Sequence, residues 1–309
     1  MNLSQGSFTA VDYVIFALLL ILSSSVGVYY LFSERKKSYR EYFLTNRSMP
    51  IAPIAFSLMA SFMSAITILG VAAESYFYGT QYAMISLGYA IATPISTYVF
   101  LPVFYNMQTT SIFEFLEKRF NKEVRLVASL VFILQMIIYM AIVLYAPAIA
   151  LSAVMGLSKW TSVLLIGSVC TFYSTIGGMR AVLWTDLFQA LFMFFAVFAI
   201  IIKGTVDVGG LSEVWRIATE GERIELFNFD PDPTVRHTFW TVVVGGMFTC
   251  FSANGINQAQ VQRLLTSRSL KESRLLAYIL ISSFLIVYSQ KLKCWMIFLP
   301  LLHVGNSVL

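Results

Sequence analysis

Charged residues are scarce in this sequence. Asp, Glu, Lys and Arg make up 12% of the 309 residues, where an ordinary soluble domain carries roughly 25%. Hydrophobic residues make up 58%, and the mean hydropathy is +0.75. This composition excludes a water-soluble globule. Since a membrane-spanning helix needs about 20 mostly apolar residues, we expect an all-α integral membrane protein with a single transmembrane domain over residues 1–309.

Cysteine and histidine are also rare, with three and two copies. Cys170, Cys250 and Cys294 lie in or beside apolar runs without the spacing of metal ligands or of a disulfide framework. No nucleophile elbow, Walker loop or histidine cluster is present, so catalysis has no visible machinery and we expect no enzyme and no cofactor. The formal charge of +5 comes from basic residues scattered through short loops, which excludes a nucleic-acid partner.

Apolar runs bounded by charges or turn residues predict eight spans in a lipid bilayer. They cover about 11–32, 49–77, 81–106, 125–155, 160–177, 181–203, 238–260 and 275–300. With the N-terminus outside, 14 of the 21 Lys and Arg residues fall on inner connections and 7 on the outer side. This split satisfies the positive-inside rule. The longest connection, about 204–237, is acidic and falls outside, and the uncharged run of the fourth span is long enough to require a tilt.

Hydroxyl groups line one face of the second predicted span. Ser57, Ser61, Ser64 and Thr67 follow one another at intervals of three or four residues among small residues. Two interpretations stay open: close packing against another helix, or a binding site. If the helix is locally unwound near Ala60, freed carbonyls and these hydroxyls would suit a small cation.

The seventh predicted span contains glycines at two places, Gly245-Gly246 and Asn254-Gly255. Glycine costs about 1 kcal/mol relative to alanine inside a helix. Both places therefore favour a discontinuous helix. Two carboxylates lie near the spans: we expect Asp186, near the inner end of the sixth span, to form a structural or gating ion pair with a nearby arginine, and Glu74 to lie at the outer interface.

Four motifs in order resemble the sodium:solute symporter family. They are ASFMSAITILG at 60–70, TSIFEFLEKRFNKEVR at 110–125, IGGMRAVLWTDLFQ at 176–189 and NGINQAQVQRLLTSRSLKESR at 254–274. The resemblance covers about residues 8–288. It implies a five-plus-five inverted-repeat transporter fold with one extra N-terminal helix, about 11–32. The first repeat would cover about 49–203, the outer loop about 204–237, and an incomplete second repeat about 238–300.

The resemblance also implies a site. Sodium, the coupling ion, would be held by the backbone carbonyls of Ala60 and Met63 together with oxygens from a later helix. ASFMSA is close to the iodide, monocarboxylate and multivitamin branch, so a small organic anion is the expected solute. The pocket candidates are Phe62, Ser64, Thr67, Ser86, Ala253, Asn254 and Gln258.

The expected function is sodium-coupled import of that anion across the plasma membrane, with the N-terminus extracellular. After Tyr288 the sequence departs from the family pattern and lacks the helix that would supply the sodium hydroxyls. An alternative prediction is therefore a transport-incompetent truncated isoform that acts as a regulatory or assembly partner of a full-length symporter.

Overall fold

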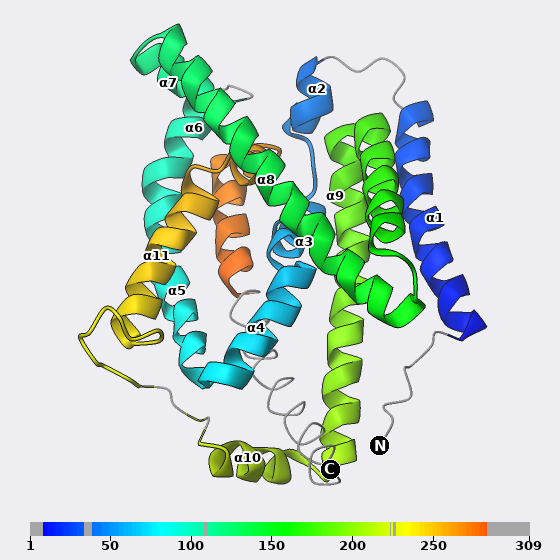
Figure 1. Ribbon diagram of the computed structural model, residues 1–309. Helices are drawn as coiled ribbons and strands as arrows, with labels where there is room; N and C mark the ends of the chain where they lie inside the picture. The colour runs from blue at the N-terminus through cyan, green and yellow to red at the C-terminus, as the bar shows by residue number, and fades with distance from the viewer. Residues whose placement is uncertain (1–8, 34–38, 108–110, 223, 225–226, 283–309) are drawn as a thin grey trace.

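Helices account for all the regular structure that the computed structural model describes (Figure 1), which covers residues 9–33, 39–107, 111–222, 224 and 227–282. Within these ranges, four helical segments are long and apolar enough to cross a membrane. Three are single helices: α1 (Ala10–Ser33), α8 (Lys122–Met155) and α9 (Lys159–Val208). The fourth, Thr80–Met107, joins η2 (Thr80–Met84), α5 (Ile85–Ile95), η3 (Ser96–Phe100) and α6 (Leu101–Met107).

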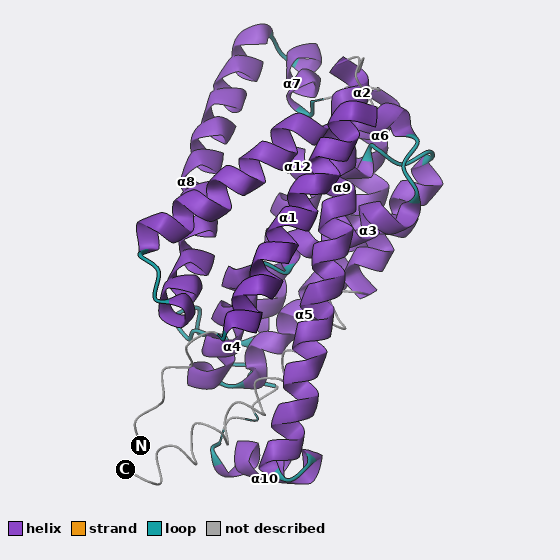
Figure 2. Ribbon diagram, turned by 90° about the vertical axis from the view of Figure 1, so that its right-hand side faces the viewer, coloured by secondary structure: helices purple, strands orange, loops and turns teal. Residues whose placement is uncertain are grey.

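Short helices outside the predicted spans lie at opposite ends of the bundle. Figures 1 and 2 show α2 (Tyr39–Leu44) and α7 (Phe113–Arg119) at one end and α10 (Leu211–Glu220) at the other. The segments that carry α2 and α7 are basic inner connections in the predicted topology, and α10 belongs to the predicted acidic outer loop. The distribution of these helices therefore agrees with the predicted alternation of sides; which end faces outward stays a prediction.

The helix α8, which is uncharged from Leu126 to its end at Met155, runs obliquely across the bundle (Figure 1). Its 34 residues span roughly 50 Å at 1.5 Å per residue, more than the hydrocarbon core of about 30 Å. Large apolar side chains cover its outward surface: Leu134 is 60% exposed and Ile137 is 63% exposed. A patch of this extent in contact with water would be costly, so the bilayer is the solvent that this surface fits.

The helix α9 bends sharply at Gly178, where φ is 67° and ψ is −167°. The bend separates arms that correspond to the predicted fifth and sixth spans, 160–177 and 181–203. A Cβ atom at Gly178 would lie 2.9 Å from the ring of Tyr42, whose hydroxyl donates to the carbonyl of Thr175 at 2.8 Å. Only glycine combines this backbone conformation with such a close neighbour.

The second predicted span is broken into α3 (Ile51–Phe62) and α4 (Ala65–Tyr78). A 3-10 turn, η1 (Thr45–Arg47), comes just before α3. The buried core centres on α3, where Ile54 and Leu58 are fully buried against Leu183 of α9 and Leu276. Leu276 belongs to a helix over 270–282; the predicted span 275–300 continues beyond the described residues.

The seventh predicted span is broken at one of the two expected places. The chain forms η4 (Trp240–Val244), α11 (Gly245–Cys250) and η5 (Phe251–Gly255) without interruption, then leaves helical geometry at Ile256 and Asn257 before α12 (Gln258–Leu264). The prediction of a break at Gly245-Gly246 is wrong. A Cβ atom at Gly246 would lie 2.8 Å from the Ile85 side chain, and one at Gly88 would lie 2.3 Å from the Val243 carbonyl. These glycines permit close helix packing.

Candidate ion and solute site

The break between α3 and α4 exposes backbone oxygen atoms inside the bundle. Met63 leaves helical geometry with φ −92° and ψ 52°, and Ser64 is extended with φ −78° and ψ 163°. The Met63 N–H still donates to the carbonyls of Met59 and Ala60, at 3.1 Å each. Because Met63 is not helical, its own carbonyl points out of the helical ladder. The unwinding expected near Ala60 is therefore present.

Two helix ends with opposite partial charges meet at this break. The C-terminus of α3 carries partial negative charge, and the N-terminus of α4 carries partial positive charge. Ser64 caps α4: its hydroxyl oxygen accepts from the Thr67 N–H at 3.2 Å and lies 3.1 Å from the Thr67 hydroxyl. The arrangement can hold a cation against α3 and an anion against α4.

Phe62, the last residue of α3, packs against two core clusters. One is the α3 cluster described above, and the other contains Ile85, Tyr89 and Cys250. Ser86, another pocket candidate, is buried in α5 between Ile85 and Gly88, which both pack on the α11 segment. The break thus lies against the helices that carry the rest of the candidate set.

The predicted hydroxyl face of the second span is divided in two by the break. Ser57 and Ser61 lie on α3 and turn toward charged residues, whereas Ser64 and Thr67 lie at the start of α4. The Ser57 hydroxyl donates to Asp186 Oδ2 at 2.5 Å, and Arg263 donates to the Ser61 hydroxyl at 2.7 Å. The packing interpretation therefore holds for Ser57 and Ser61, whereas the binding-site interpretation of Ser64 and Thr67 stays a prediction.

Asp186 of α9 has an arginine partner, Arg263 of α12, with 3.6 Å between Arg263 Nη2 and Asp186 Oδ2. The side chains are 15% and 17% exposed. The pair joins the second arm of α9 to the segment that follows the second helix break. Whether it acts as a gate stays a prediction.

The candidates on the second broken helix lie in η5 and α12. Ala253 and Asn254 lie in η5, and the Asn254 amide donates to Cys250 Sγ at 3.3 Å. Gln258 accepts from the Ile112 N–H at 2.8 Å and donates to Gln262 at 3.3 Å. Its amide thus ties α12 to the start of α7, and its assignment to a solute pocket stays a prediction.

Polar residues of the third apolar span went unnoticed in the sequence, although Thr93, Ser96 and Thr97 stand together in the stretch IATPISTYVF. All three are buried, and they line a cavity with Asn254 and Gln260. The sequence does contain a signal for this polar group, because three hydroxyls and a proline fall within five residues of an apolar span. Arg263 was also missed as the partner of Asp186, because only the fold brings residues so distant in sequence together.

At the opposite end of α4, Glu74 forms a charged cluster with the loop that precedes η4. Arg236 donates to both Glu74 oxygens, at 2.7 and 3.1 Å, and lies over the Tyr78 ring at 4.2 Å. His237 Nε2 is 3.1 Å from Glu74. Burial lowers the pKa of His237 below its ordinary value, and this effect outweighs the opposing influence of Glu74.

Comparison with known proteins decides the family, because the sodium:solute symporter family profile matches residues 42–304. The chain belongs to this family. Relatives include a putative sodium-dependent multivitamin transporter of Drosophila melanogaster, 53% identical over 87% of this chain and 45% of that protein. A sodium-dependent multivitamin transporter of Oryctolagus cuniculus is 48% identical over 88% of this chain and 43% of its own length.

A third symporter relative, sodium-coupled monocarboxylate transporter 1 of Xenopus laevis, is 45% identical over 89% of this chain and 44% of its length. The chain thus spans about half the length of the curated relatives that it matches. All three are named as transporters, not enzymes. Their names give no support to the alternative of a regulatory or assembly partner.

The symporter fold expected from the sequence is confirmed by a solved structure of a Na+-coupled sialic acid symporter in a substrate-bound, outward-open state. The two superpose with a TM-score of 0.88 at 26% identity, over 98% of this chain and 64% of the other. The chain is an all-α membrane protein with this transporter architecture. The exact boundaries of its extra helix, first repeat, outer loop and second repeat stay predictions.

Proposed function

We propose that this chain acts in sodium-coupled symport that imports a small organic anion across the plasma membrane. The observation that carries the proposal is the break at Met63 and Ser64. The carbonyls of Ala60 and Met63 would contribute to the sodium site, at the negative end of α3. The resemblance to the family implies that the remaining oxygens come from a helix of the second repeat.

The solute would bind on the other side of the break. A carboxylate suits the N-terminus of α4, where the first N–H groups of a helix point outward. Ser64 and Thr67 offer hydroxyls there, and Phe62 supplies an apolar wall between the two core clusters. The multivitamin and monocarboxylate names of the relatives support an organic anion. Ser86, Ala253 and Asn254 are proposed as pocket residues on the facing helices.

Binding of sodium and binding of the anionic solute would be coupled because both charges lie at the same helix break. A sodium ion beside α3 lowers the cost of bringing an anion to α4 in a site with little water. Each positive charge that enters the cell gains about 2.3 kcal/mol per 100 mV of membrane potential. We place the N-terminus outside, as the basic inner connections favour.

The test is solute uptake by the full chain reconstituted in liposomes. Radiolabelled lactate, biotin and iodide are offered in sodium buffer and in choline buffer, with protein-free liposomes and an Ala60→Phe variant as controls. We expect sodium to stimulate uptake of a carboxylate and Ala60→Phe to abolish the stimulation. Equal uptake in choline refutes the coupling, and sodium-stimulated uptake of iodide alone refutes the organic anion.

A further inference from the structure

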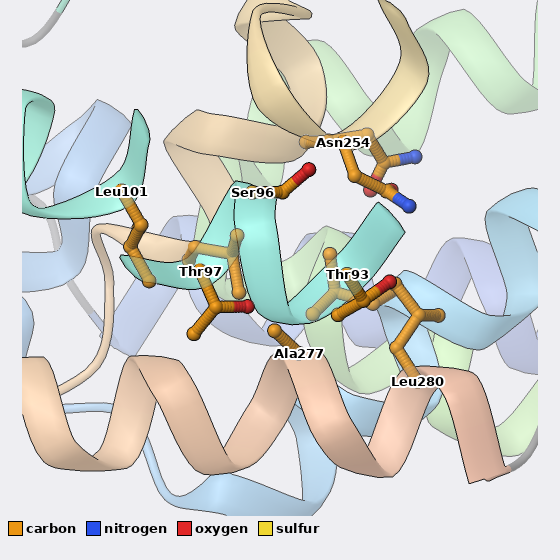
Figure 3. Close-up of a pocket in the computed structure, with 10 residues that line it drawn as sticks. Thr93, Ser96, Thr97, Leu101, Asn254, Ala277 and Leu280 are labelled. Atoms are coloured by element: carbon orange, nitrogen blue, oxygen red, sulfur yellow. The ribbon is translucent and has the colours of Figure 1, made fainter. Parts of the chain in front are cut away.

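A small cavity lies between η3, the broken η5–α12 segment and the helix at 270–282 (Figure 3). About 20 Å³ of it is open to the centre of a water-sized molecule. Leucine and alanine side chains form much of its wall, and its polar wall consists of Thr93, Ser96, Thr97, Asn254 and Gln260. Phe62, Ser64 and Thr67 do not line this cavity; of the residues proposed for the solute pocket, Asn254 alone is among its described lining residues.

Four oxygen atoms in this wall are buried and have no hydrogen-bond partner among the described residues: Ser96 Oγ, Thr97 Oγ1, Asn254 Oδ1 and Gln260 Oε1. In Figure 3 the Ser96 hydroxyl is directed toward Asn254. A buried polar group without a partner costs about 1–3 kcal/mol. Four such groups around one cavity therefore indicate a ligand that satisfies them together.

The chemistry of the four groups distinguishes water from an ion. The two hydroxyls can each donate a hydrogen, and the two amide oxygens can only accept. A water molecule matches this set, since it accepts two hydrogen bonds and donates two. A cation would use the oxygen lone pairs but would leave both hydroxyl hydrogens without acceptors among leucine side chains. An anion would be repelled by the two amide oxygens, which carry partial negative charge. In the described wall no carboxylate offsets the cost of burying a cation.

We propose that this cavity binds an ordered water molecule that bridges η3 to both sides of the second helix break. Asn254 precedes the non-helical residues Ile256 and Asn257, and Gln260 follows them. The volume is sufficient for such a molecule, and buried waters commonly make about three hydrogen bonds. The water links side chains on the two sides of the break to η3.

A high-resolution cryo-electron microscopy map of the full chain in nanodiscs tests the occupant. We expect density in the cavity at hydrogen-bonding distance, about 2.7–3.2 Å, from oxygens of η3 and α12. It should be the same in sodium chloride and in a buffer without sodium or chloride. Absence of density overturns the proposal. Density that disappears when either ion is removed also overturns it, because the occupant is then that ion.

A double-mutant cycle of thermal stability tests the bridge. Thr97→Val and Gln260→Met keep side-chain volume and remove one partner of the water each. We expect each to lower the melting temperature by about 2–4 °C and the double variant to lose less than the combined amount. Additive losses overturn the bridge. The matched control is Thr205→Val, which removes a hydroxyl that donates to the Ile201 carbonyl at 2.7 Å. Its decrease in melting temperature should add fully to the decrease caused by Thr97→Val. If Thr97→Val does not fold, Ser96→Ala takes its place in the cycle.

Discussion

Arg263 and Asp186 form a largely buried ion pair 3.6 Å apart, and both also contact serines of α3: Arg263 binds Ser61, and Asp186 binds Ser57. The pair therefore connects three segments, α3, α9 and α12. The hydroxyls of Ser57 and Ser61 provide hydrogen bonds to the carboxylate and the guanidinium in addition to the ion pair itself. This network is the only described contact set that links Asp186 to the half of the second span preceding its break.

Removing one partner of this pair should destabilise the protein strongly. Arg263→Met leaves Asp186 buried without its cation, a loss that costs about 3–5 kcal/mol in comparable pairs. The double variant Arg263→Met with Asp186→Leu should regain much of the loss, because no unpaired charge remains. Thermal unfolding in detergent measures both. The control is Arg216→Met on exposed α10, where the pair with Glu213 is largely solvated and little change is expected. An Arg263→Met variant as stable as the parent would show that the pair carries no stability.

The bend in α9 should depend on glycine at position 178. Gly178→Ala combines a positive φ with a Cβ atom 2.9 Å from the Tyr42 ring, so we expect a loss of about 1–3 kcal/mol in stability. Gly210→Ala is the matched control, since φ is 112° and ψ is 172° there and no atom lies within 4 Å of the added Cβ. Gly210→Ala should lose less. Equal losses at the two positions, measured by thermal unfolding, would assign the whole effect to backbone strain and none to Tyr42.

The cap at Ser64 should matter for sodium. Ser64→Ala removes the hydroxyl that accepts from the Thr67 N–H, and loss of an N-cap costs about 1 kcal/mol. If sodium binding orders this break, the concentration of sodium for half-maximal uptake should rise about fivefold. Ser24→Ala, whose hydroxyl bonds within α1, should leave it unchanged. An unaltered sodium dependence in Ser64→Ala would exclude this serine from the coupling site.

Acid should weaken the cluster at Glu74. The pKa of His237 is lower in the folded protein than in the unfolded chain, mainly because the ring is partly buried and Arg236 is close, with Glu74 opposing. The unfolded chain then binds the proton more tightly. Stability is complete above the ordinary histidine pKa of about 6.5 and falls as the pH drops through it toward the lower folded value. Thermal unfolding between pH 8 and 5 should show this decrease.

His237→Phe tests the source of that pH dependence. It keeps an aromatic ring next to Tyr78 and Tyr82 but removes the titrating nitrogens. The variant should flatten the stability profile between pH 5 and 7. A slope that persists in His237→Phe would locate the titration elsewhere.

Sequence patterns predicted the transmembrane class, because apolar runs identify spans from local features. The hydroxyl pattern near Ala60 left helix packing and local unwinding both open, and the resemblance to the symporter family favoured the break. The same reasoning failed at Gly245-Gly246, because glycine also serves close packing, and only the position of Ile85 distinguishes the two uses. The partner of Asp186 and the oxygens around Asn254 could not be predicted, since they depend on which distant helices meet.

The glycine contact between α5 and the α11 segment restricts how this protein can move. With Gly88 and Gly246 each pressed against the opposite helix, neither helix can slide along the other without a clash. We therefore expect the two helices to move together as one unit, so that displacements within the bundle are taken up by the segments around them.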